Sequence, residues 1–103
     1  MFNLQPNPTF KARVPITIAG QEKPAHVEIE FRHMTREGVK TFFENLGGRT
    51  DGEALADIVV GWSGVDQAFS QEALLVLLDN FPSAAAAIFK VFSSELFEAR
   101  TKN

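Results

Sequence analysis

The chain contains no cysteine, which excludes disulfide bonds, thiolate nucleophiles and metal sites built on cysteine. Histidine is also scarce, with two residues in 103, so few side chains are suited to metal binding or to proton transfer near neutral pH. We therefore expect no cofactor and no metal. Thirteen acidic and ten basic side chains give a net charge of −3, whereas a general nucleic-acid binder presents a dense positive charge. The charge thus predicts no nucleic-acid partner.

Long hydrophobic runs are missing too. The longest, residues 73–78 and 84–89, have six residues each, and a membrane-spanning helix needs about 20. Residues 1–6 carry no positive charge and no apolar stretch, so they do not resemble a signal peptide. We therefore expect no membrane partner and a location in the cytoplasm.

The aromatic residues are almost all phenylalanine: there are ten Phe, one Trp and no Tyr. Phe has no polar atom, so its ring is best placed inside a core or against a partner. The length fits one domain, which we assign to residues 1–103. Because a domain this small buries only about two-thirds of the surface that its unfolded chain exposes, we expect some Phe rings to contact another protein.

Two alternating segments predict a β-hairpin over residues 10–33. Residues 1–9 before it are expected to form an extended arm, because Pro6 and Pro8 oppose helix. Within the hairpin, apolar and polar residues alternate with the period of two that half-buried strands show. The apolar positions are Phe10, Ala12, Val14, Ile16 and Ile18, then Ala25, Val27, Ile29 and Phe31.

The two apolar faces also predict how the strands pair. Matching them sets Ile16 opposite Val27 and leaves a loop at residues 20–23. Pro15 has no N–H to donate to a neighbouring strand, so we expect the first strand to lie at a sheet edge.

The remaining residues, 35–101, predict about four helices. The last begins at Pro82 or Ser83 and runs to about Arg100. The first three have N-cap candidates at Thr35, Thr50 and Ser70. The fold class is therefore α+β, with an N-terminal arm and a two-stranded antiparallel hairpin followed by these helices.

Two of these helices have distinctive apolar patterns. The third is apolar all round over residues 73–78, which predicts burial on every side, within the monomer or between subunits. The second carries an apolar stripe at Ala54, Leu55, Ile58, Val59 and Trp62.

Residue patterns that would indicate catalysis are weak. Ser63 lies in a Gly-Trp-Ser-Gly segment, but the second glycine comes one position too early for a nucleophile elbow. His26 and His33 have no obvious acidic partner in the sequence, and the glycine-rich residues 47–52 match no phosphate-binding motif. We therefore expect a protein that is not an enzyme. A small enzyme or ligand-binding domain is the least favoured class.

Hydrophobic residues at helix ends and between the second and third helices are the candidates for protein interaction. Trp62 and Phe81 fit a core position equally well, and Phe97 fits either a partner surface or packing under the N-terminal arm. For self-association we expect the hairpin edge or a helical face, in which case a charged residue at Phe97 abolishes oligomers. The candidate residues are Trp62, Phe69, Phe81, Val91 and Phe97.

Four motifs, taken in order, carry a resemblance to a known family. They are NPTF at residues 7–10, FRHMTRE at 31–37, IVVGW at 58–62 followed by Asp66 and Phe69, and LLDNFP at 77–82. Together they resemble the small tail assembly chaperones of long-tailed bacteriophages and prophages, over residues 3–101. Each motif alone is weak, and their order and spacing carry the resemblance.

The resemblance implies a chaperone that binds the tape measure protein and helps to recruit subunits of the major tail tube protein. It also implies self-association into a homo-oligomer, absence from the finished virion, and a longer form made by ribosomal frameshifting. The alternative is a non-enzymatic adaptor that binds one helical protein partner as a monomer.

Overall fold

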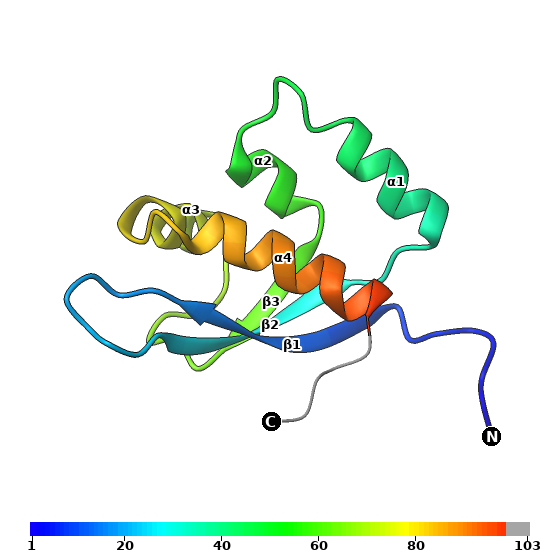
Figure 1. The fold of residues 1–103 in the computed structure, drawn as a ribbon, viewed down its shortest axis with the longest axis horizontal. Helices are drawn as coiled ribbons and strands as arrows, with labels where there is room; N and C mark the ends of the chain where they lie inside the picture. The colour runs from blue at the N-terminus through cyan, green and yellow to red at the C-terminus, as the bar shows by residue number, and fades with distance from the viewer. Residues whose placement is uncertain (99–103) are drawn as a thin grey trace.

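The structure is a computed structural model and describes residues 1–98. These residues form one antiparallel sheet and four helices, with the N-terminal residues extended to one side (Figure 1). In chain order the elements are β1 (Thr9–Ile16), β2 (Ala25–Arg32), α1 (Arg36–Glu44), α2 (Asp51–Ala56), β3 (Val59–Ser63), α3 (Gln71–Asn80) and α4 (Ala84–Phe97). The mixed α and β content agrees with the predicted class, but the sheet has three strands in the described residues rather than two.

The strand order is β1-β2-β3, so β1 lies at an edge, as Pro15 predicts. The predicted register is wrong by two residues, because Val14 rather than Ile16 pairs with Val27. A shift of two keeps the same side chains on the same face, so alternation alone does not distinguish the two registers. The chain leaves β1 early, with a turn in which the Gln21 N–H donates to the Ile18 carbonyl (3.1 Å) and Gly20 has a φ of 85°.

The second predicted helix is too long. It ends at Ala56, where the N–H groups of Asp57 and Ile58 donate to carbonyls three residues back and tighten the last turn. Val59–Ser63 then forms β3 beside β2, with Trp62 opposite Ile29. The β-branched run of Ile58, Val59 and Val60 favours a strand, although the apolar spacing fits a helix. This third strand of the sheet was not predicted from the sequence.

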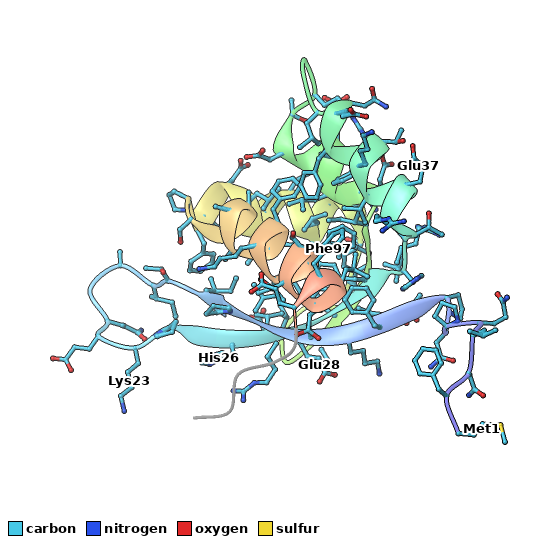
Figure 2. The ribbon with its side chains drawn as sticks, turned by 45° about the vertical axis from the view of Figure 1, so that its right-hand side comes forward. Met1, Lys23, His26, Glu28, Glu37 and Phe97 are labelled. Atoms are coloured by element: carbon cyan, nitrogen blue, oxygen red, sulfur yellow. The ribbon has the colours of Figure 1, made fainter. Side chains whose placement is uncertain are left out.

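The core lies between one face of the sheet and the helices. Figure 1 shows α4 crossing that face, with the other helices on the same side of the sheet. The inward side chains of the strands, such as Ile29 and Phe31, are fully buried, as are Ile88 and Phe92 of α4. The opposite face is polar, and His26 and Glu28 point away from the helices in Figure 2. The sheet is therefore half-buried, which is what its alternating strands predict.

Three of the helices have the predicted side-chain N-caps. The hydroxyl of Thr35 accepts from the N–H of Gly38, and that of Ser70 accepts from the N–H of Ala73, both at 3.0 Å. Helix α4 begins after Ser83 and ends at Phe97; Arg100, the predicted end, lies outside the described residues. Thr50 and Glu53 form the predicted capping box at α2.

Helix α3 is covered on one side only by its own chain. Ala73 and Leu74 are buried, whereas Leu75 and Val76 are each 51% exposed. Burial on every side within the monomer is therefore wrong for this helix. The other part of that expectation, burial against another molecule, stays a prediction.

The capping box affects the pKa of Glu53. Its carboxylate accepts from the backbone N–H of Thr50 (3.1 Å) and from the Thr50 hydroxyl (3.0 Å). These two bonds hold the pKa of Glu53 below its ordinary value. The resulting stabilisation is present above the pKa of Glu53 in the unfolded chain, and it is lost as the pH falls through the lowered folded pKa.

Thr50→Ala should therefore raise the pKa of Glu53 only part of the way to its ordinary value, because the backbone N–H of residue 50 remains. An NMR titration of the Glu53 carboxyl in both proteins measures this change. An unchanged pKa in the variant would contradict the role given to the hydroxyl.

Candidate interaction surfaces

Three of the predicted interaction residues gather at one place. Trp62 of β3 and Phe69 of the following loop pack edge to face, with ring centres 5.2 Å apart. Trp62 and Phe81, the residue that ends α3, line the same hollow of about 170 Å³. The hollow also includes the half-exposed Val76. Helix α3 and β3 therefore bring together aromatic residues that are far apart in the sequence.

The polar edge of Trp62 is already bonded within the chain. Its Nε1–H donates to the backbone carbonyl of Gln67 at 2.9 Å, and Gly64, with a φ of 82°, lets the chain turn out of β3. The bond ties the loop after β3 to the strand. The N–H group of Trp62 is consequently satisfied within the chain, and its ring lines the hollow.

A second hollow, of about 250 Å³, adjoins the first and shares its residues Val65, Asp66, Leu77 and Phe81. It extends to the end of the hairpin through Ile16, Ile18, Ala25 and Val27. We call the two together the α3 hollow. Asp66 is the one charged residue among its lining residues, so the surface is apolar with a single negative charge.

Val91 belongs to a different surface. It lines a groove of about 490 Å³ between the outer side of α4 and the end of β1, together with Arg13, Pro15 and Ile18. A further hollow of about 440 Å³ continues along β1 to Lys11 and Ala12 and shares Arg13 and Glu95 with the first. We call this pair the β1 groove. It runs beside the edge strand of the sheet.

Phe97 lies apart from both surfaces, at the end of α4. Its side chain is 55% exposed (Figure 2), so the packing under the N-terminal arm that was one of its two expected environments is not what the structure shows. It stays a predicted interaction residue. The five predicted residues thus fall on three separate places rather than one.

Several exposed apolar residues were not among the candidates. Leu75 and Val76 project from α3, and Phe2 and Leu4 are 86% and 84% exposed on the N-terminal arm. The unbroken apolar run at residues 73–78 was the signal for the first pair, since one chain of this size covers such a helix on one side only. The arm, extended and without an apolar face to pack on, was the signal for the second pair.

The polar residues considered for catalysis are placed as follows. The hydroxyl of Ser63 donates to Glu28 across the outer face of the sheet at 3.4 Å, and His26 is exposed on that face opposite Pro15. Within residues 1–98 no group of three or more histidines or carboxylates is arranged to hold a metal ion. No single helix in this part of the chain is long and apolar enough to cross a membrane; α3 and α4 meet that criterion only as a pair, bent by 114°.

The fold and these surfaces define a small mixed α and β protein with apolar hollows on its surface. The sequence model of the phage tail assembly chaperone family matches residues 1–103, and the chain belongs to that family. The family indicates a non-enzymatic role in phage tail assembly with phage tail proteins as partners, in agreement with the resemblance of the four motifs. Comparison with curated proteins and comparison with solved structures each give no match.

Proposed function

We propose that the protein binds the tape measure protein of its phage or prophage and helps to recruit subunits of the major tail tube protein during tail assembly. Copies of the chain associate with one another. The protein acts in the cytoplasm of the bacterial host and is absent from the mature virion. The observation that carries the proposal is the α3 hollow, which is lined by Trp62, Phe81 and the half-exposed Val76.

The α3 hollow suits a helical client. An amphipathic helix binds by setting apolar side chains three and four residues apart into an apolar groove. A tape measure protein, as a long and largely helical chain, offers many such faces. The single negative charge at Asp66 favours a client helix with a Lys or Arg beside its apolar face, which orients the helix.

The exposed residues of α3 give this binding a free-energy source. Val76 lines the hollow and is about half exposed, so covering the remainder of its side chain contributes about 1 kcal/mol. Trp62 and Phe81 are partly covered already and are held in place by their own chain, so little side-chain freedom is lost when a client binds. Trp is one of the residue types enriched in binding hot spots, which lie in well-packed pockets ringed by contacts that exclude water.

Co-expression with the client tests the proposal. The source DNA is first searched near this reading frame for a very long helical reading frame, which supplies the tape measure protein. We expect that protein to aggregate when expressed alone and to stay soluble and co-purify when this chain is present. A tape measure protein that remains insoluble and does not co-purify would contradict the proposal. Capture of one other helical protein by a monomer would favour the adaptor alternative.

A further inference from the structure

The N-terminal arm is an apolar segment with nothing of its own chain covering it. Phe2 and Leu4 are 86% and 84% exposed, and no residue from 1 to 8 has a charged side chain. Pro6 and Pro8 each restrict the residue before them to extended conformations. The arm thus carries two large apolar side chains into solvent, on a peptide whose residues 5 and 7 are restricted by the prolines that follow them.

The β1 groove is a recess with both apolar and charged lining residues, and it lies beside the unpaired edge of the sheet. β1 has a neighbour on one side only, so the backbone groups on its other side are open to another strand, except at Pro15, which has no N–H to donate. Pro15, Ile18 and Val91 supply apolar lining. A strand that pairs with such an edge gains main-chain hydrogen bonds while its alternate side chains fill the recess.

The arm and the groove match in length and in charge. Eight extended residues span about 27 Å, which equals the length of the eight-residue β1. The charged lining residues of the β1 groove cancel, with Lys11, Arg13 and Lys90 against Glu22, Glu28 and Glu95. The arm adds no charged side chain to this balance, and its one charge is the α-amino group of Met1 at its end.

The arm cannot readily reach the groove of its own chain. Figure 2 places Met1 at one end of the sheet and Lys23, in the hairpin loop, at the other, and the groove extends toward that loop. The Pro8 carbonyl still accepts from the N–H of His33 (2.9 Å), so the chain is held in line with the sheet at the base of the arm. A return along β1 needs a sharp reversal where two prolines favour extension.

We propose that the arm of one copy adds to the edge of β1 in a second copy and sets Phe2 and Leu4 into the β1 groove. This inference deepens, and rests on, the self-association in the proposed function; binding of the tape measure protein is independent of it. One arm in one groove buries on the order of 800 Å² over both surfaces, and two copies that exchange arms reciprocally share an interface of about 1,600 Å², the size of a standard stable interface.

The first test compares the molar mass of the wild-type chain and Phe2→Asp/Leu4→Asp by light scattering over a range of concentrations. The wild-type chain should associate, and the double variant should lose about 100-fold or more in association constant, because two large apolar side chains no longer bury. Ala86→Asp is the matched control. Ala86 is exposed on α4 and lines neither the β1 groove nor the α3 hollow, so the Ala86→Asp protein should have the same molar mass in solution as the wild-type protein.

The second test uses cysteines placed in a chain that has none. Leu4→Cys mixed with Val91→Cys should form a disulfide-linked heterodimer on mild oxidation, whereas Leu4→Cys mixed with Ala86→Cys should not. This test needs no destabilising change, since both introduced side chains are small.

A monomeric wild-type chain, an arm variant with the wild-type mass, or no heterodimer from the first cysteine pair would each overturn the proposal. Phe97→Asp distinguishes arm exchange from self-association through a helical face, because this change leaves the arm and the β1 groove intact. Dissociation by Phe97→Asp with an unaffected arm variant would assign self-association to the end of α4. Retained capture of the tape measure protein by the arm variant distinguishes failure of this inference from failure of the proposed function.

Discussion

Phe92→Ala is expected to lower the free energy of unfolding by about 3–5 kcal/mol. Phe92 is fully buried on α4, and its ring centre lies 5.5 Å from that of Phe31, 6.1 Å from that of Phe42 and 6.2 Å from that of Phe10. It therefore joins the sheet, α1 and α4 in one aromatic cluster. Removing the ring leaves a cavity bordered by side chains from three elements, which cannot all move to fill it.

Equilibrium unfolding in urea measures this loss. Because small domains have total stabilities of about 5–15 kcal/mol, the variant should be close to unfolding at physiological temperature. Phe97→Ala is the matched control, since the same ring is lost from a site that is 55% exposed, and it should change stability by no more than about 0.5 kcal/mol. Equal losses for the two variants would contradict the packing described for α4.

Val76→Asp should weaken binding of the tape measure protein by about tenfold or more while leaving the fold in place. Val76 is half exposed, so the fold tolerates a polar group there. It also lines the α3 hollow, where a bound client would leave the new carboxylate buried without a partner. A pull-down with titrated client, or calorimetry on a soluble client fragment, measures the change.

The control for this variant is Ala86→Asp, which places the same charge on an exposed position of α4 outside the α3 hollow. It should bind the client as the wild-type chain does. Equal binding by the Val76 and Ala86 variants would show that the client binds elsewhere. The circular dichroism of both should match that of the wild type, which separates lost binding from lost structure.

The strands of the hairpin and the helix starts could be predicted because local chemistry decides them. Alternation assigns each side chain of β1 and β2 to a face, and Thr35, Thr50 and Ser70 satisfy backbone N–H groups a few residues away. The register depends instead on where the turn forms. Gly20 and the turn at Ile18 move it by two residues without changing either face.

β3 and the α3 hollow could not be predicted because they depend on the assembled fold. Val59–Ser63 is short, and its β-branched residues favour a strand while its apolar spacing continues that of α2, so pairing with the open edge of β2 decides between the two. Trp62 and Phe81 come together only once that strand is in place. The exposure of Val76 likewise follows from which side of α3 the rest of the chain covers.

Hydrogen–deuterium exchange of the protein with and without the tape measure protein tests the central claim most directly. We expect slower exchange on client binding in α3 and in the loop that joins it to β3, because both line the hollow beside Trp62 and Phe81. The exposed end of α4 and helix α1 should exchange as in the free protein. Protection confined to α1 or α4, with α3 unchanged, would contradict the assignment of the α3 hollow as the client site.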